Sequence, residues 1–406
     1  MPAEERRSLF WRTSSSRDML LFSLLFLWCP LFGILAYALY LSQQSEVSIR
    51  RLWGLAVMLA LYLGCLAVTK ERLGDFLEYS RLFHEVPKYN FFSYIMLFGK
   101  EPVYYGYTYL AYYLFLGNWN LFVLSITVAN YLFLSYGVLK VAGYLHTSIN
   151  HTLVALFFMA FFFQEFAAIG NMFRQGLAQS ITLAFLVRWY LVGKRSWWMA
   201  LCAVGIHTSS LPILAVGLLP VIQRKMEWRT LAKLSVMVVL AAVFFFFVGG
   251  YLAHLPFIGY IFVRATDYER LLATDSWQTE VGLQSSMIVL LLVLGGMIVF
   301  FYRKLESSVL YVFINLNLLL LLMMIVCHIG EMYYLLMRYF FYIYAFQNVL
   351  FLIFLHENRF FQKTVPQLSV VVLMISYFYY QFSHNIFSYI PVLEALVYPL
   401  PVYLII

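Results

Sequence analysis

The chain has 406 residues, of which 63% are hydrophobic and only 11% are charged. This composition excludes a soluble globular protein and predicts an all-α polytopic integral membrane protein. The net charge of +8 does not indicate nucleic acid as a partner, because most lysines and arginines fall in short loops, where they set orientation. The cysteines lie in apolar runs without CxxC spacing, so we expect no disulfide.

Apolar runs long enough for a spanning helix, roughly 20 residues, recur along the chain. The first covers 19–41 and is too long for the apolar core of a signal peptide, so we expect a retained span. Together the segments give about ten to thirteen membrane segments, some short or re-entrant, in one integral domain over 1–406. Expected spans are 19–41, 52–69, 119–140, 171–193, 231–252, 282–302, 307–328 and 333–355, with shorter or interrupted segments at 103–117, 151–164, 196–221, 367–381 and 386–406.

Short basic loops predict the orientation of these segments. Those at 194–195 and 224–233 flank the segment 196–221 on both sides and are expected in the cytoplasm. Because both ends of 196–221 then lie on one side, we expect a re-entrant hairpin. The loop 253–281 falls on the external face. If 103–117 spans the membrane, 70–102 is cytoplasmic; if it does not, all of 70–118 is external, which we favour because fifteen helical residues reach only about 22 Å. Counting the spans from the cytoplasmic loops back to the start of the chain places the N-terminus outside, whereas its arginines favour the cytoplasm.

A polar stripe marks the start of the run 171–193. At 100° per residue, Asn171, Arg174, Gln175 and Gln179 share one helical face. Such a stripe faces protein or water rather than lipid. Snorkelling to the headgroups would explain the arginine alone, but not the glutamines. We therefore expect Arg174 and Gln175 to bind substrate.

Two later stretches also carry polar groups. GIHTSSLP places His207 and Ser209 at the expected hairpin turn, where an imidazole suits proton transfer or a hydrogen bond to a sugar or phosphate. A structural histidine is the alternative, and a Ser–His nucleophile is disfavoured because no acid lies nearby in the sequence. HIGEMYYLLMRYF carries Glu331 and Arg338 on one helical face, for which a structural ion pair is the alternative.

The most polar part of the chain is KERLGDFLEYSRLFHEVP, which includes Arg72 and Asp75. It is either an amphipathic helix on the membrane surface or the source of a base, Asp75. Further on, Glu101 precedes Pro102, which indicates a helix start. The tyrosines that follow suit an interfacial aromatic belt or stacking against sugar rings.

Arginines at expected external helix ends indicate the kind of ligand. Arg72, Arg174 and Arg338 occupy such ends, and Arg264 and Tyr268 lie in the external loop. A guanidinium binds phosphate bidentately and stays charged. The pattern favours a phosphate or pyrophosphate ligand, which a polyprenyl lipid carries in a membrane. No paired acids have metal-binding spacing, so we expect neither a metal nor a cofactor.

The order of these motifs resembles the EpsG-type family, the Wzy-like bacterial exopolysaccharide and O-antigen polymerases. RLGDFLEY resembles the family's Arg-Gly-Asp-Tyr segment, and EPVYYGY its Glu-Pro-aromatic helix start. NMFRQGLAQSI resembles its Arg-Gln-x-x-Ala helix, GIHTSSL its His-x-Ser turn, and LLMRYFFY its late Arg-aromatic helix. RLGDFLEY lacks the threonine often found beside the family's aspartate.

The resemblance implies a GT-C-like fold in the bacterial inner membrane. It also implies transfer of a growing glycan from undecaprenyl pyrophosphate to a lipid-linked repeat unit on the external leaflet, with a flippase and a chain-length regulator as partners. The candidate bases are Asp75, Glu101, His207 and Glu331. The candidate substrate-binding residues are Arg72, Tyr79, Arg174, Gln175, Ser209, Arg264, Tyr268 and Arg338.

Three alternative functions stay open. A GT-C glycosyltransferase that uses a polyprenyl-phosphate sugar would take Asp75 or Glu78 as its base, often with a metal. An O-antigen ligase needs a larger external loop than 253–281. A flippase for lipid-linked oligosaccharides should show two-fold internal repeats, and none is visible in the sequence.

Overall fold

The computed structural model describes residues 16–72, 74–98, 101–227, 229–230, 233, 236–237, 240, 309–329, 333–385 and 390–404. In these ranges the chain forms helices joined by short turns, with no β-strand among them, so the expected all-α membrane fold is confirmed. The chain divides into two compact units, Met1–Leu211 with Phe351–Ile406, and Pro212–Leu350. Each is described by itself, and the expectation of a single domain stays a prediction.

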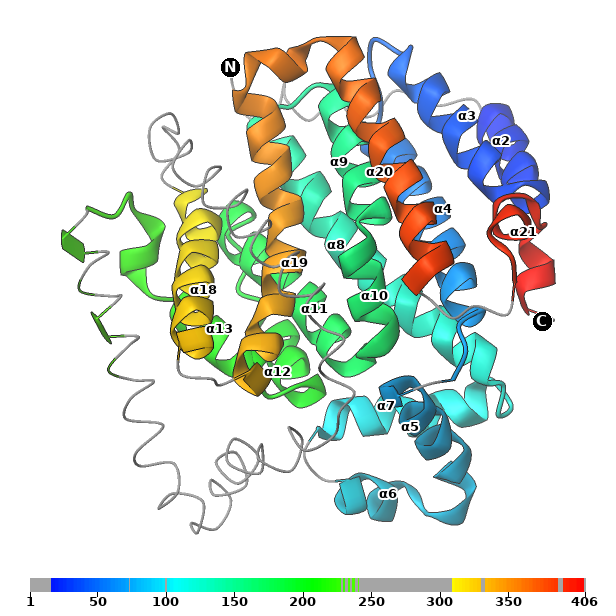
Figure 1. The fold of residues 1–406 in the computed structure, drawn as a ribbon, viewed down its shortest axis with the longest axis vertical. Helices are drawn as coiled ribbons and strands as arrows, with labels where there is room; N and C mark the ends of the chain where they lie inside the picture. The colour runs from blue at the N-terminus through cyan, green and yellow to red at the C-terminus, as the bar shows by residue number, and fades with distance from the viewer. Residues whose placement is uncertain are drawn as a thin grey trace. The chain divides into compact units, whose positions relative to one another are not determined.

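Long apolar helices form the core of the larger unit. They are α4 (Ile49–Val68), α8 (Trp119–Leu145), α9 (Ile149–Phe161), α11 (Phe173–Leu191) and α20 (Thr364–Asn385). Figure 1 shows α4, α8, α9 and α20 side by side. Among the described residues, α4, α8 and α20 are each long and apolar enough to cross a membrane. The expected spans 52–69 and 119–140 therefore correspond to α4 and α8.

The close packing of α4 on α8 depends on a glycine. A Cβ atom at Gly64 would lie 2.7 Å from Cδ1 of Leu124, so a larger residue here would require the leucine side chain to shift. The remaining faces of α4 bury leucine, alanine and aromatic side chains. This burial fixes the position of the α4 end that leads into the polar segment after residue 68.

The expected interrupted segment 151–164 is a bent pair of helices. α9 ends at Phe161, α10 runs Phe163–Asn171, and the two bend by 46°. A second break at Met172, with φ −129° and ψ 67°, separates α10 from α11. Asn171 therefore ends one helix and Arg174 lies in the first turn of the next, so the expected stripe on one continuous helix is wrong at its first member.

The expected single span 19–41 is also wrong, because the chain reverses within it. α2 (Ser16–Trp28) and α3 (Pro30–Ser42) form an antiparallel hairpin. Asp18 at its start accepts a hydrogen bond of 2.7 Å from the hydroxyl of Tyr40 near its end. The reversal lies at Cys29, whose backbone is extended because the next residue is Pro30. Each arm of 13 residues is about 20 Å long, shorter than a membrane core of roughly 30 Å.

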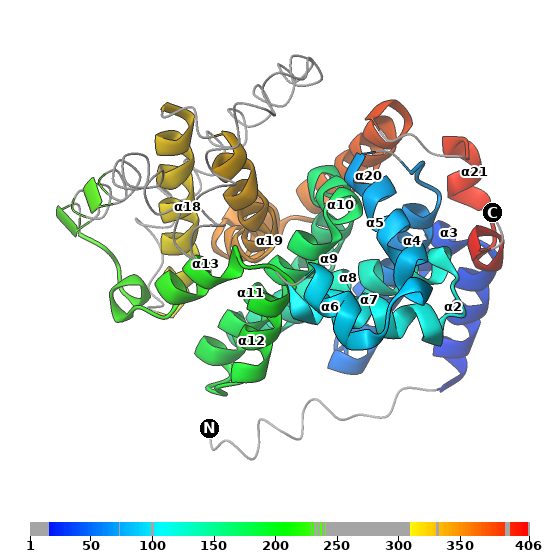
Figure 2. The same cartoon turned by 90° about the horizontal axis from the view of Figure 1, so that it is seen from below.

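Short helices cover one end of this core. They are α5 (Gly74–Glu85), α6 (Phe91–Phe98) and α7 (Pro102–Leu114), and they lie across the end of α8 at which Trp119 begins it (Figures 1 and 2). The ring of Phe76 on α5 lies 5.4 Å from that of Trp119. α5 buries one face and exposes the other, which the polar segment predicts.

The expected hairpin 196–221 begins as two short helices. α12 (Trp197–Ile206) and α13 (Ser210–Gly217) are separated by a break at His207. The break falls at the turn that the sequence predicts, and the re-entrant path itself stays a prediction.

Further helices complete the described chain. α18 (Tyr311–Ile329) packs on the 3₁₀ turn Pro220–Gln223, where the amide of Asn315 donates to the carbonyl oxygens of Ile222 and Arg224 at 2.8 and 2.9 Å. α19 (Tyr333–Glu357) precedes α20, and α21 (Val392–Val397) follows it. Most of 231–252, and all of 253–281 and 282–302, lie outside the described residues.

Candidate functional site

Arg174, in the first turn of α11, is the centre of a polar cluster in the larger unit. Its Nη1 donates to Oε2 of Glu101 at 2.5 Å and to the hydroxyl of Tyr105 at 3.2 Å. Its Nε donates to the hydroxyl of Tyr79 at 3.3 Å. The guanidinium also lies over the rings of Tyr79 and Tyr104, at 5.3 and 5.9 Å from their centroids. With 25% of its side chain exposed, Arg174 is held by protein groups.

Aromatic packing fixes the direction of this arginine. Phe173, the first residue of α11, is fully buried, and its ring lies 5.3 Å from Tyr79 and 5.4 Å from Phe76, both on α5. The break at Met172 frees the first turn of α11 to meet α5 at this point. The side chain that follows Phe173 therefore enters the space between α5 and α7.

Glu101 bridges Arg174 to a histidine. It is the N-cap residue of α7, whose first residue is Pro102 as the sequence predicts, but its carboxylate makes no capping bond to its own helix. Oε2 accepts from Arg174, while Oε1 lies 3.5 Å from Nε2 of His207. Only 7% of the Glu101 side chain is exposed. One buried carboxylate thus joins groups from α11 and from the end of α12.

The hydrogen bonds of His207 indicate its tautomer. The backbone N–H of Ser209 points at Nδ1 at 3.2 Å, and the hydroxyl of Ser209 lies 2.7 Å from the same atom. Because a backbone N–H can only donate, Nδ1 is an acceptor and the neutral ring holds its proton on Nε2. That proton faces Glu101, so His207 orients the carboxylate.

A glycine permits the contact between these two elements. A Cβ atom at Gly205 would collide with Cγ2 of Val103, so α12 approaches the first turn of α7 without a side chain between them. Gly205 lies two residues before His207, and Val103 lies two residues after Glu101. The close approach brings the imidazole within reach of the carboxylate.

The structure thus brings Tyr79, Glu101, Arg174, His207 and Ser209 together. The other expected residues lie elsewhere. Arg72 and Asp75 are exposed, and Arg72 lies over the ring of Trp119 at 5.8 Å. Gln175 is buried in α11. Arg264, Tyr268 and Glu331 are outside the described residues, and of Arg338 only the backbone, in α19, is described. The catalytic and substrate-binding roles expected for the residues of this paragraph stay predictions.

Sequence reasoning missed the link between Glu101 and His207. It found no acid near the histidine, because the acid comes from a helix far away in the chain. The helix start at Pro102 was the available signal, but it does not say where the carboxylate of the preceding residue points. Tyr104 and Tyr105 were expected only as members of a tyrosine-rich stretch.

Lys70 is a second buried cation that the sequence did not single out. Its Nζ donates to Oδ1 of Asn171 at 2.5 Å, and a Cβ atom at Gly170 would lie 2.9 Å from that nitrogen. Burial lowers the pKa of Lys70 from its ordinary 10.5 to about 7. The bond ties the end of α4 to the break that precedes Arg174.

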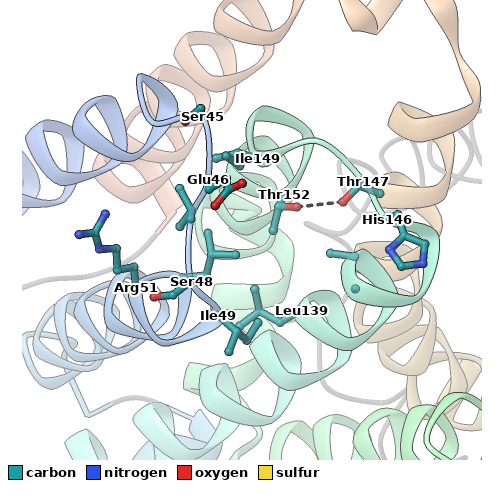
Figure 3. A pocket seen from close by; sticks show the side chains of 14 residues that line it. Ser45, Glu46, Ser48, Ile49, Arg51, Leu139, His146, Thr147, Ile149 and Thr152 are labelled. Atoms are coloured by element: carbon teal, nitrogen blue, oxygen red, sulfur yellow. Dashed lines mark hydrogen bonds between the residues drawn. The ribbon is translucent and has the colours of Figure 1, made fainter. Parts of the chain in front are cut away.

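A pocket of about 410 Å³ lies at the other end of α4, far along that helix from Lys70. Glu46, Arg51 and His146 line it together with the hydrogen-bonded pair Thr147 and Thr152 (Figure 3). Glu46 and Arg51 are the charged side chains that line it. It belongs to the end of the bundle opposite the Arg174 cluster.

Comparison with known proteins gives one match. Residues 51–393 match the model of the EpsG family. No curated protein and no solved structure matches the chain. The matched range contains every residue of the Arg174 cluster.

Proposed function

The chain belongs to the EpsG family, and on this premise we propose that it is a polysaccharide polymerase. It transfers a growing glycan from undecaprenyl pyrophosphate to a lipid-linked repeat unit. The observation that carries this proposal is the mostly buried Arg174, held by groups from α5 and α7. A guanidinium in such surroundings suits a pyrophosphate that must gain charge as it leaves.

The chemistry requires one bond to form and one to break. A hydroxyl of the acceptor sugar attacks the anomeric carbon of the donor glycan, and the bond from that carbon to the pyrophosphate oxygen breaks. The pyrophosphate keeps the electron pair and stays on the lipid, and the hydroxyl proton passes to a base. Cleavage of the bond between the anomeric carbon and the pyrophosphate oxygen drives transfer, so the protein positions the two lipids, stabilises the leaving group and removes one proton.

Glu101 is the proposed base. Nδ1 of His207 already accepts a hydrogen bond from Ser209, and Nε2 holds its proton, so the imidazole offers no lone pair to the acceptor. The carboxylate can take the proton while His207 orients it. Tyr79, Tyr104 and Tyr105 are buried around the guanidinium and hold it in place.

The distribution of basic residues supports an external site. Arg50 and Arg51 lie at the start of α4, opposite the cluster. The turn Arg359–Gln362 lies at that same end, because Nε2 of His151 near the start of α9 is 2.9 Å from the carbonyl oxygen of Phe361. By the positive-inside rule this end faces the cytoplasm and the cluster faces outward. The α2–α3 hairpin places Ser16, where α2 begins, at this same end of the bundle.

The test uses purified protein in detergent with undecaprenyl-pyrophosphate-linked repeat units and no ion gradient. A ladder of glycans on a gel, formed equally well in EDTA, is the expected result. EDTA-sensitive transfer of single sugars from a polyprenyl-phosphate donor would replace the proposal with a GT-C glycosyltransferase. If only vesicles move lipid-linked oligosaccharide and no glycan lengthens, the protein is a transporter.

A further inference from the structure

We infer that Glu101 holds, in the substrate-free protein, the place on Arg174 that a phosphate oxygen takes when the lipid pyrophosphate binds. Displacement from Arg174 then frees the carboxylate to act as the base. This inference rests on the proposed function and adds to it a coupling between donor binding and base activation.

The hydrogen bonds of Arg174 favour such a displacement. Nη1 and Nε, two of its three donor nitrogens, already bond protein groups, and the strongest of these contacts is the charge-assisted bond to Glu101 at 2.5 Å. A pyrophosphate that approached the guanidinium with Glu101 in place would set two or more negative charges beside a buried carboxylate. Like charges at such short range repel strongly where water is scarce.

Glu101 has a place to go. Its Oε1 is already 3.5 Å from Nε2–H of His207, and the carboxylate can shorten that contact by turning away from Arg174. The side chain makes no capping bond with α7, so the turn breaks no such bond. As an N-cap residue before Pro102 it also lies at the positive end of that helix dipole, which favours its charge after it leaves the arginine.

The inference predicts opposite effects of one substitution on two measurable quantities, the affinity for the donor lipid and the rate of transfer. If Glu101 competes with the pyrophosphate, removing its charge strengthens donor binding, because the guanidinium then lacks its anionic partner within the protein. If Glu101 is also the base, the same change slows transfer. A residue with only a structural role would weaken binding, and a base without a competing role would leave binding unchanged.

The experiment compares the wild type with Glu101→Gln and Glu101→Asp in detergent. Equilibrium binding of undecaprenyl pyrophosphate is measured by the quenching of intrinsic tryptophan fluorescence, and single-turnover transfer is measured on a gel. We expect Glu101→Gln to bind the lipid about ten-fold more tightly and to transfer glycan at least about 100-fold more slowly. Glu101→Asp, whose shorter side chain cannot reach Arg174 and His207 together, should also bind more tightly, which covers the case in which the glutamine variant does not fold.

Glu85→Gln is the matched control, since Glu85 is also paired with an arginine, Arg81, at 3.1 Å but outside the cluster. It should match the wild type in both measurements. A wild type that polymerises and binds the lipid, with Glu101 variants that bind it equally or less well, would overturn the inference and leave the proposed function standing. A wild type that neither binds the lipid nor lengthens a glycan would overturn both.

Discussion

Two ion-paired clusters of the larger unit use the same residue types in opposite surroundings. On α5, Arg81 bonds Glu78 at 2.6 Å and Glu85 at 3.1 Å, all within two turns of one helical face on which Arg81 and Glu78 are about half exposed. Around Arg174, the acid comes from the start of α7 and the histidine from the end of α12, and Glu101 and His207 are each about 7% exposed. One cluster forms as soon as its helix forms, whereas the other exists only in the folded unit.

The difference in burial changes how much each cluster can contribute to stability. Water and salt screen the α5 pairs, and the bond to Arg81 lowers the pKa of Glu78, as any surface arginine would. Desolvation of Arg174 and Glu101 costs free energy that their attraction barely repays. A buried pair of this kind is weak evidence for a stabilising role, and the proposed function gives it a role in substrate binding.

We expect the largest effect on stability from removing one member of the buried Arg174–Glu101 pair. Arg174→Met leaves Glu101 charged and without its arginine, so we expect a loss of about 3–5 kcal/mol in the free energy of unfolding. The double variant Arg174→Met with Glu101→Met should recover most of it. Thermal unfolding in detergent measures both, beside Arg81→Met as the exposed counterpart, which should barely shift the midpoint. Equal shifts of the unfolding midpoint in Arg174→Met and Arg81→Met would mean that the buried and the exposed ion pairs contribute equally to stability.

The imidazole is the next test of the buried cluster. His207→Ala removes the group that orients Glu101, so we expect transfer to slow by about 100-fold. His207→Gln, which keeps an N–H donor, should retain part of the rate. The ladder assay measures both, with His146→Gln at the pocket of Figure 3 as a control. A full rate in His207→Ala would remove the histidine from the mechanism.

The buried Lys70 predicts a pH dependence of stability. Its pKa of about 7 in the folded protein lies below the ordinary 10.5. Between these values the unfolded chain holds a proton that the folded protein lacks, so stability rises with pH, by at most about 1.4 kcal/mol per pH unit. Below about pH 7 both states hold the proton and the penalty is complete.

Unfolding midpoints between pH 7 and 9 check this slope. We expect the wild type to gain stability across the range, Lys70→Met to stay level, and the exposed Lys88→Met to behave as the wild type does. A slope that persists in Lys70→Met would assign the pH dependence to other groups.

The smallest effect is expected at the contact that joins α12 to α7. Gly205→Ala should push the imidazole away from the carboxylate and slow transfer about ten-fold, since a displacement of less than 1 Å already misaligns catalytic groups. Adding Val103→Ala should restore the rate by reopening the space. Gly143→Ala on α8, where nothing lies within 4 Å of the added atom, is the neutral control. If Val103→Ala brings no recovery, the contact does not position His207.

The apolar runs in the sequence predict where long helices form, but they do not predict whether the chain continues or reverses within a run. α4 and α8 follow from uninterrupted apolar runs. The α2–α3 hairpin does not follow from its apolar run, because such a run has the same composition whether the chain crosses the membrane or reverses within it. Pro30 is the residue that indicates the reversal.

The same limit applies to the site. The polar residues at the start of α11 predicted correctly that Arg174 lies inward. No periodicity within one segment relates that arginine to Glu101 and His207, because each comes from a different helix. Their meeting depends on the break at Met172 and on the close approach at Gly205, which are properties of packing between helices.

The most direct test of the central claim is the glycan ladder made by purified wild type, Arg174→Lys and Arg81→Lys. Lysine keeps the charge but cannot present the planar fork that meets two phosphate oxygens. The account predicts a ladder in the wild type and in Arg81→Lys, and none in a folded Arg174→Lys. A full ladder from Arg174→Lys would contradict the claim that this guanidinium holds the leaving pyrophosphate.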